Sequence, residues 1–218
     1  MDYSKQKIFF QKAYELGDER IKSGYGWPVE VDKQVVKFFN HIKKFVYKGK
    51  SLDLGCGQGR HTIFFAEKGL NSYGIDYIPR VITEAKQQAK SKGLKNVRFV
   101  LKDILNLDFP KYYFDLILDW SVLDHIHPKD WQKYLNNILR VLKINGYLIL
   151  TEFSAEDSRI VGKTQNYKID RNSYDHYFKV AELKEIFSPN FKFIKIQTTT
   201  LATKTPHSMV NVLLKRIL

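Results

Sequence analysis

The chain contains very little cysteine: Cys56 is the one thiol among its 218 residues. A single cysteine excludes a disulfide within the chain and suits a reducing compartment such as the cytoplasm. There is also no run of 18 apolar residues, so we expect no membrane-spanning helix. Residues 1–7 include no apolar stretch of the kind that a secretory signal needs. We therefore predict a cytoplasmic protein without a membrane partner.

Internal repeats, low-complexity tracts and linker-like segments are absent as well. A hydrophobic content of 44% and an aromatic content of 14% exclude a disordered chain. The length suits one domain with one full core. We predict a single domain over residues 1–218, in which residues 1–48 form a helical lid segment and residues 49–218 form the core. The oligomeric state is left open by the sequence.

Acidic residues are outnumbered by basic ones, 23 to 36, which gives a formal net charge of +13. A basic surface attracts acidic partners in general. The excess is spread along the chain, with concentrations in residues 33–50 and 86–102, and both segments suit solvated helix faces and loops. Nucleic acid therefore stays an alternative partner that the charge alone favours.

Three glycines at alternate positions mark the most informative stretch. The apolar run of residues 51–54 leads into Gly55, Gly57 and Gly59, and an amphipathic segment starts at His61. This pattern predicts a strand, a tight turn and a helix start. Glycine permits positive φ and removes Cβ atoms that would block a ligand. The helix N-terminus presents unpaired N–H groups to a carboxylate or phosphate.

Acidic residues occur at three successive predicted strand ends. Asp53 precedes the glycines, Asp76 closes the apolar run 72–75, and Asp103 follows the strand predicted over residues 97–102. Asp76 comes 21 residues after Gly55, close to where a ribose-binding carboxylate lies in a Rossmann-like unit. The third glycine comes one residue too early for the dinucleotide pattern G-x-G-x-x-G, which makes a nicotinamide-dependent enzyme a distant alternative.

Apolar residues at helical spacing predict two N-terminal helices. The first covers residues 3–16, with Ile8, Phe9, Ala13 and Leu16 on its apolar side, and the second runs from Val31 to Phe45. Between them lies the loop 25–28, which contains Tyr25 and Trp27. This loop is either an aromatic plug or a lid that closes over a ligand, because flanking glycines permit movement.

The remaining chain alternates predicted strands with helices. After residues 51–54 and 72–75, the strands cover residues 97–102, 113–119, 147–152, 191–197 and 209–214; helices start near Pro79, Pro128 and Val180. Such alternation indicates a parallel sheet, whereas the short link 198–208 requires antiparallel pairing of the last two strands. The predicted fold is an α/β, Rossmann-like doubly wound domain. Its seven-stranded, mostly parallel sheet has an antiparallel last strand. Residues 153–178 are predicted to be a long, irregular functional loop.

The pattern D-x-G-x-G-x-G-R, from Asp53 to Arg60, resembles motif I of the class I methyltransferases that use S-adenosylmethionine. Residues 114–128, 139–146, Tyr177 and His207 are similar to the thiopurine methyltransferase-like and tellurite-resistance-like group, which modifies small molecules. Trp120 and Asp124 depart from that group. The resemblance spans about residues 50–216. It implies S-adenosylmethionine as cofactor, S-adenosylhomocysteine as product, and direct displacement of the methyl group by a small-molecule acceptor.

The resemblance and the strand-end positions nominate residues that bind the cofactor. They are Asp53, Gly55, Cys56, Gly57, Gly59, Asp76, Tyr77, Asp103, Ile104, Asp119 and Trp120. Some have a second reading. Cys56 either lies beside the ligand or is a small side chain that fills space in the core. The Trp120 ring either stacks on adenine or on the substrate, or it belongs to the core. Arg60 either contacts the cofactor carboxylate or pairs with an acid.

Histidines in the loops after three strands are candidates for acceptor binding and proton transfer, because imidazole accepts protons near neutral pH. Each can instead cap a helix or pack. The catalytic candidates are His125, Asp119 and His176; the substrate-binding candidates are Tyr25, Trp27, Trp120, His125, His176, Tyr177 and His207. His125 and His127 have a spacing that suits a metal, but they adjoin Pro128 at a helix start, and we predict no metal site.

Two missing motifs narrow the choice of acceptor. No Asn/Asp-Pro-Pro-aromatic run, typical of amino-group methylation of bases, follows the fourth strand. Carbon-5 methylation of pyrimidines needs a cysteine nucleophile, and Cys56 lies inside the glycine loop. We therefore predict a small-molecule methyltransferase. An RNA or protein methyltransferase and a non-catalytic S-adenosylmethionine-binding protein are the alternatives.

Overall fold

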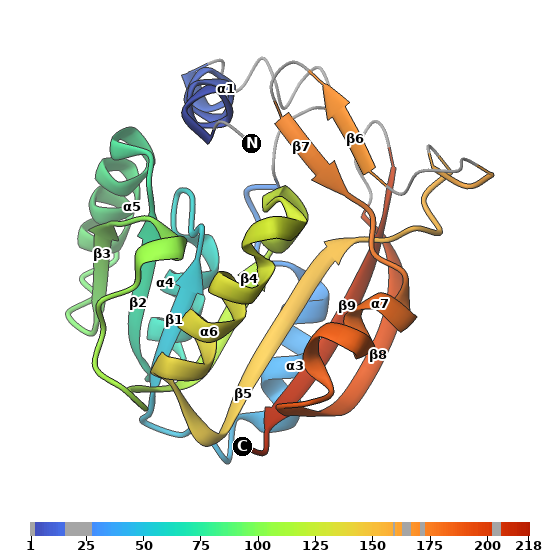
Figure 1. The fold of residues 1–218 in the computed structure, drawn as a ribbon. Coiled ribbons are helices and arrows are strands. Elements are labelled where there is room, and N and C mark those ends of the chain that lie inside the picture. Colours follow the sequence, from blue (N-terminus) through green and yellow to red (C-terminus); the bar gives the residue numbers. More distant parts are fainter. Residues whose placement is uncertain (1–2, 16–27, 159, 163–166, 171–172, 202–205) are drawn as a thin grey trace.

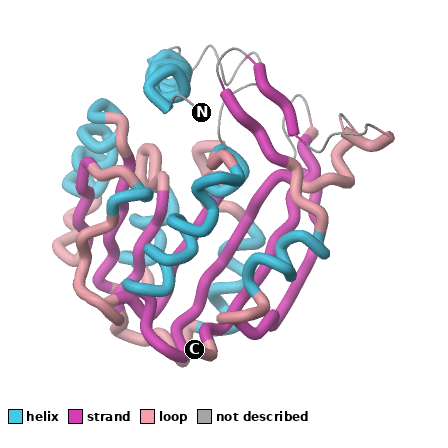
Figure 2. Tube along the Cα trace, in the orientation of Figure 1, coloured by secondary structure: helices cyan, strands magenta, loops and turns pink. Residues whose placement is uncertain are grey.

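A seven-stranded mixed sheet forms the centre of the computed structural model (Figure 1). The structure describes residues 3–15, 28–158, 160–162, 167–170, 173–201 and 206–218. The strands follow the order β3-β2-β1-β4-β5-β9-β8, with helices on both sides of the sheet (Figure 2). No helix in these ranges combines the length and the hydropathy needed to cross a membrane.

The strand pairing confirms the predicted fold class. Strands β1 to β5 pair in parallel, and β9 runs antiparallel to both of its neighbours, β5 and β8. The strands are β1 (Lys50–Leu54), β2 (Asn71–Asp76), β3 (Val97–Leu101), β4 (Phe114–Trp120), β5 (Leu142–Phe153), β8 (Phe191–Leu201) and β9 (His207–Arg216).

Two apolar layers cover the sheet. Helices α6 and α7 pack on one face, around Ile117 and Leu148, while α3 and α4 cover the other, around Leu118 and Trp120. Alternate residues of β4 thus serve opposite layers, as expected for a buried parallel strand. The helices are α1 (Tyr3–Glu15), α3 (Lys33–Ile42), α4 (Arg60–Glu67), α5 (Pro79–Ser91), α6 (Trp131–Val141) and α7 (Val180–Phe187), with short 3-10 turns η1 (Ile104–Asn106), η2 (Leu123–His125) and η3 (Pro128–Asp130).

The buried side of α1 differs from the prediction. Gln6, Phe10 and Ala13 are buried, whereas Ile8 is 53% exposed. Phe45, which we placed on the apolar side of the second helix, lies beyond the end of α3 and is 61% exposed. Apolar spacing alone did not predict the buried face of α1, because this helix packs over a partly polar edge of the sheet. Gln6 on its inner face hydrogen-bonds there to the backbone oxygen of His125.

A two-stranded hairpin replaces part of the irregular loop that we predicted over residues 153–178. Strands β6 (Tyr167–Asp170) and β7 (Ser173–His176) pair antiparallel. Figure 1 shows this hairpin near α1, beyond the edge of the sheet where β1, β2 and β4 end. The prediction failed because the strands are short and polar, so the period-2 signal was weak. Together, α1 and the hairpin overhang the carboxyl edge of the sheet.

Gly59 sets the start of α4. It adopts φ 86°, and a Cβ there would lie 2.7 Å from the Phe99 ring and 3.0 Å from the Cβ of Ala85. Gly69 has a similar φ of 90°, but nothing lies within 4 Å of its would-be Cβ. Glycine is therefore required at position 59 for two reasons: the backbone is left-handed there, and the turn packs closely against α5 and β3.

We predict that Gly59→Ala destabilises the fold more than Gly69→Ala. The left-handed backbone should cost either variant roughly 1–2 kcal/mol, and the clash at Gly59 should add about 1–3 kcal/mol. Urea unfolding of both variants measures the difference. Equal losses would show that the contact with Phe99 and Ala85 relaxes without cost.

Candidate functional site

A cavity of about 500 Å³ lies at the carboxyl edge of the sheet, with α1 as part of its wall. The ends of β1, β2, β3 and β4 and the loops after them contribute most of the remaining lining. Ten of the predicted site residues line it: Asp53, Gly55, Cys56, Gly57, Asp76, Tyr77, Asp103, Ile104, Trp120 and His125. The strand-end reasoning therefore brings most of the proposed cofactor residues to one place.

The glycine loop approaches its neighbours too closely for side chains. Gly55 and Gly57 have φ values of 57° and 52°. A Cβ at Gly55 would lie 2.7 Å from Cγ2 of Val122, and a Cβ at Gly57 would lie 2.8 Å from the hydroxyl of Tyr14 on α1. The bare backbone thus lets Val122 and Tyr14 pack against the loop, and both glycines line the cavity.

Two buried carboxylates support this loop. Asp53 accepts a hydrogen bond of 2.6 Å from Thr62 Oγ1. Asp76 accepts hydrogen bonds from the backbone N–H groups of Gly57 (3.0 Å) and Ile78 (2.9 Å). Burial raises the pKa of Asp53 to about 7 and that of Asp76 to about 6. Asp76 is therefore the link that joins the end of β2 to the glycine loop.

Tyr77, Asp103 and Ile104 line the cavity on the β2–β3 side. The Lys7 ammonium on α1 lies 5.8 Å from the centre of the Tyr77 ring. Asp103 caps η1 by accepting a hydrogen bond of 2.8 Å from the Leu105 N–H, and it is exposed. An aromatic ring, an aliphatic side chain and a carboxylate thus surround this part of the cavity, a combination that suits a heterocyclic base.

Arg60 places a cation against the wall formed by Trp120. Its guanidinium lies 4.2 Å from the Trp120 ring centre, and its Nε donates to His61 Nε2 at 3.3 Å. Burial and the nearby Arg60 charge lower the pKa of His61 well below its usual value, so His61 is neutral. Within the described ranges no carboxylate pairs with Arg60, which leaves its cavity-facing charge suited to an anionic group of a ligand.

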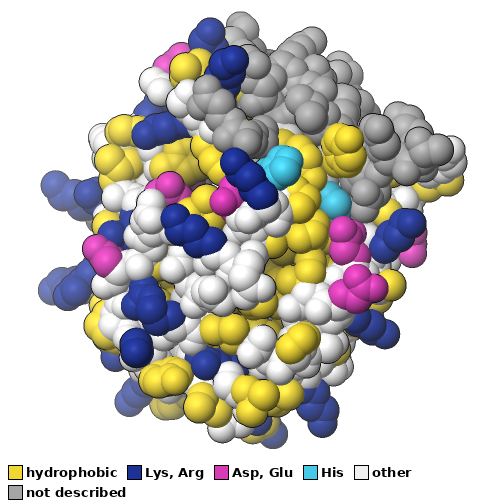
Figure 3. Space-filling model, viewed as in Figure 1, with side chains coloured by type: hydrophobic (Ala, Val, Ile, Leu, Met, Phe, Trp, Pro, Cys, Tyr) yellow, Lys and Arg dark blue, Asp and Glu magenta, His cyan; other side chains and the backbone are white. Residues whose placement is uncertain are grey.

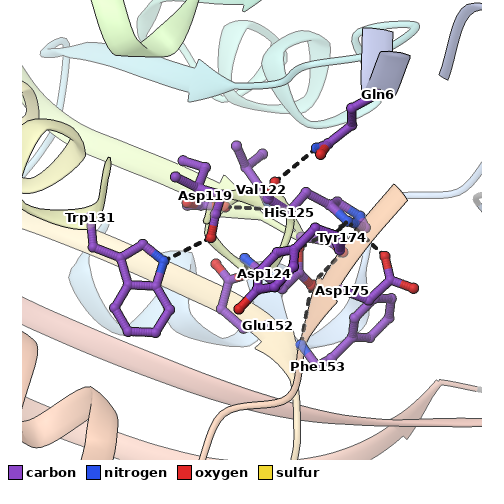
Figure 4. Close-up of polar contacts among 12 residues, drawn as sticks. Gln6, Asp119, Val122, Asp124, His125, Trp131, Glu152, Phe153, Tyr174 and Asp175 are labelled. Atoms are coloured by element: carbon purple, nitrogen blue, oxygen red, sulfur yellow. Dashed lines mark hydrogen bonds and ion pairs between the residues drawn. The ribbon is translucent and has the colours of Figure 1, made fainter. Parts of the chain in front are cut away.

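His125 is held between two carboxylates (Figure 4). Its Nδ1 lies 3.1 Å from Asp175 Oδ1 and 3.1 Å from the Tyr174 carbonyl oxygen, and its Nε2 lies 3.6 Å from Asp124 Oδ1. Burial lowers the pKa of His125, but Asp124 and Asp175 outweigh this effect and raise it to about 9. Both ring nitrogens face acceptors, so His125 is a cation at neutral pH. This geometry does not support a general base.

Asp119 faces away from the cavity, into a buried acidic cluster with Asp124 and Glu152. It accepts hydrogen bonds from the Tyr134 hydroxyl and from Val122 N–H at 2.9 Å. Burial raises the pKa of Asp119 to about 7 and that of Glu152 well above its usual value, and the neighbouring carboxylates of the cluster raise both further. We therefore keep Asp119 in neither the catalytic nor the cofactor-binding set.

Three further candidates lie outside the cavity lining. His176 packs against Trp131, with its Nε2 2.9 Å from Glu182 Oε1 and its Nδ1 3.0 Å from the Tyr174 hydroxyl. Tyr177 and His207 both stack on Phe153, with ring centres 5.3 and 5.5 Å away. These contacts favour packing roles. Gly59 also serves packing, and Tyr25 and Trp27 lie outside the described residues.

The cavity also contains residues that our sequence reasoning missed. Gln6, Phe10 and Tyr14 of α1 line it, as do Ile78 and Val122. A signal for the first three was present, because positions 6, 10 and 14 are spaced by four residues and share one helix face. No group of three or more metal-binding side chains occurs in the part of the chain that the structure describes.

We predict that the His125 ring titrates near pH 9 and that its contribution to stability is lost as the pH rises through that value. A raised pKa means that the contribution is fully present below the unfolded value of about 6.5. Asp175→Asn removes one carboxylate and should lower the midpoint. Histidine ring signals followed by NMR from pH 5 to 10 measure both midpoints. A midpoint at or below 6.5 in the unmodified protein would restore His125 as a candidate base.

A family model described as a methyltransferase domain matches residues 47–198. Ubiquinone biosynthesis O-methyltransferase of Rickettsia conorii is 29% identical over 81% of this chain and 61% of its own length. Phosphoethanolamine N-methyltransferase of Plasmodium falciparum is 28% identical over 67% of this chain and 53% of its own length. The human EEF1A lysine methyltransferase 2 is 27% identical over 65% of this chain and 58% of its own length. The chain thus spans about half to three fifths of these curated relatives.

Solved structures share the fold. The 1,6-didemethyltoxoflavin-N1-methyltransferase of Burkholderia thailandensis, solved with its substrate and S-adenosylhomocysteine, has a TM-score of 0.72 at 20% identity. The match covers 98% of this chain and 91% of that one. TehB from Haemophilus influenzae has a TM-score of 0.68 at 17% identity, covering 91% and 66%. Because the family model covers well over half of the chain, the resemblance to class I methyltransferases is confirmed, and the chain belongs to the methyltransferase-domain family.

Proposed function

We propose that this protein is an S-adenosylmethionine-dependent methyltransferase that acts on a small-molecule acceptor. The observation that carries the proposal is that the glycine loop, Asp76, Tyr77, Asp103 and Arg60 all line the same cavity. These residues offer a carboxylate, an aromatic ring and a cation to the parts of one ligand.

The residues present fit this cofactor. Asp76 would hold the ribose hydroxyls, while Tyr77 and Ile104 would enclose the adenine and Asp103 would accept from it. Arg60 would pair with the carboxylate of the methionine part. Gly55 and Gly57 line the cavity without side chains, which suits close approach of the ligand to the backbone.

The bound cofactor would supply an electrophilic methyl group on its sulfonium. The chain's own residues align the acceptor and keep water out beneath α1, and both effects contribute strongly to catalysis. His125 would contact the acceptor as a cation, because Asp124 and Asp175 keep it protonated. It would orient or attract the acceptor and would not remove a proton from it. This role favours acceptors whose attacking atom needs no proton removed before attack at neutral pH, such as a thiolate, the anion of an acidic hydroxyl compound or an unprotonated amine.

Three observations support a small acceptor. The cavity volume lies in the range of small-molecule sites. The relative named for ubiquinone biosynthesis and the neighbour solved with 1,6-didemethyltoxoflavin are both named for small acceptors. The motif resemblance over residues 114–128 supports the narrower thiopurine methyltransferase-like and tellurite-resistance-like group, whereas the 17% identity to TehB supports the shared fold alone. We also propose a cytoplasmic location, from the single cysteine.

A protein or RNA acceptor is the second candidate. The human relative is named as a lysine methyltransferase, and the net charge of +13 would attract an acidic macromolecule. On the face shown in Figure 3, however, Lys and Arg side chains are scattered and do not form one continuous patch. The small-molecule proposal therefore stands first.

Transfer of a radiolabelled methyl group tests the proposal directly. The panel comprises thiols, amines, acidic hydroxyl compounds, a lysine-rich protein and RNA, each with labelled S-adenosylmethionine. We expect transfer to a small molecule and weak dependence on salt. Transfer to RNA with steep salt dependence would favour the second candidate. Cofactor binding without transfer to any class would indicate a non-catalytic protein.

We predict that Asp76→Ala weakens binding of S-adenosylhomocysteine by about ten- to a hundredfold, because charge-assisted hydrogen bonds contribute roughly 1.5–3 kcal/mol. Titration calorimetry measures the affinity. The matched control is Asp115→Ala at the opposite end of β4, where the carboxylate binds Lys50 N–H at 2.8 Å and Lys143 Nζ at 2.7 Å. Unchanged affinity in a folded Asp76→Ala protein would remove Asp76 from the site.

A further inference from the structure

Helix α1 crosses the part of the cavity that we assign to the adenosine half of the cofactor. Near its start, the Tyr3 hydroxyl donates to Asp130 Oδ2 at 2.9 Å and accepts from His127 N–H at 3.0 Å. Further along, Lys7 lies over the Tyr77 ring, and Tyr14 lies beside Gly57. The inner face of α1 between these contacts therefore lies between the loop after β2 and the loop after β4.

Gln6 is the polar residue in the middle of this inner face. It is 4% exposed and lines the cavity. Its Nε2 donates a hydrogen bond of 2.8 Å to the backbone oxygen of His125 (Figure 4). A carbonyl oxygen can only accept, so this bond fixes which end of the amide faces η2. The other end, Oε1, must point elsewhere.

The buried Oε1 of Gln6 receives no hydrogen bond from the protein in the ranges that the structure describes. A buried acceptor without a donor carries a desolvation penalty, and such groups are rare in native structures. Replacing Gln6 by an apolar residue would avoid the penalty. Its presence at a cavity wall indicates that a ligand supplies the missing donor.

We propose that Gln6 Oε1 accepts a hydrogen bond from the adenosine half of the cofactor, either from the adenine amino group or from a ribose hydroxyl. The inference rests on the cofactor placement proposed above. Gln6 would then join the cofactor to the His125 backbone through a single amide.

Titration calorimetry with S-adenosylhomocysteine tests this inference in the full chain. Gln6→Met keeps an unbranched side chain of similar length but removes the acceptor, and we expect about three- to tenfold weaker binding. The matched control is Gln11→Met, the same change on the exposed face of α1, where Gln11 Nε2 donates a hydrogen bond of 3.3 Å to Glu15 Oε1. This control should bind S-adenosylhomocysteine as the unmodified protein does.

Cofactor analogues separate ligand recognition from simple packing. The set comprises the 6-deamino purine analogue of S-adenosylhomocysteine and its 2′-deoxy and 3′-deoxy analogues. If Gln6 receives the missing hydrogen bond, one analogue should bind the unmodified protein and Gln6→Met equally well, and its identity names the donor. The same loss for every analogue would show that Gln6 only fastens α1 to the His125 carbonyl, and would overturn the inference.

Two other outcomes are distinguishable. Undiminished binding of S-adenosylhomocysteine by a folded Gln6→Met protein would overturn the inference alone. Failure of the unmodified protein to bind S-adenosylhomocysteine would overturn the proposed function and the inference with it. Circular dichroism of each variant establishes that the fold is retained.

Discussion

The hydrogen bonds from Gly57 and Ile78 to Asp76 are the constraint on which the site depends. They tie the loop after β1 to the loop after β2, and so they set the shape of the cavity wall. Without this link, glycines with positive φ would leave the loop free to adopt many conformations, because glycine restricts the backbone least. The same carboxylate thus holds the two loops together and, in our proposal, binds the ribose hydroxyls of the cofactor.

A second organising element is His125, which connects segments far apart in the sequence. Its ring contacts Asp175 and Tyr174 of β7, its backbone oxygen accepts from Gln6 of α1, and Phe10 packs on the ring edge-to-face, with centres 4.9 Å apart. The helix and the hairpin that overhang the sheet therefore meet at one cation. A cation whose ring nitrogens both face acceptors is poorly suited to accept a proton. The contacts that hold α1 and the hairpin at His125 therefore argue against the role of general base that its position in the sequence suggested.

Local spacing was sufficient to predict the seven strands of the main sheet, the glycine loop and the shared position of Asp53, Asp76 and Asp103, because the carboxyl ends of parallel strands meet at one edge. Side-chain direction was not predictable in the same way. Asp119 and Trp120 are adjacent at the end of β4, and only packing decides that Trp120 reaches the cavity while Asp119 joins Glu152. The contacts of His176 depend on the hairpin, which the sequence pattern did not predict, and the stacking of His207 on Phe153 depends on how β9 packs beside β5.

The two edge strands of the sheet explain part of the charge excess. Strand β3 has Arg98, followed by Lys102, and strand β8 has Lys192 and Lys195 at exposed or half-exposed positions. Unpaired backbone groups at a sheet edge can pair with another chain and start aggregation, and lysines on an edge oppose this. Basic side chains at both edges thus oppose edge-to-edge pairing of the sheets of two copies, a use of positive charge that requires no acidic ligand.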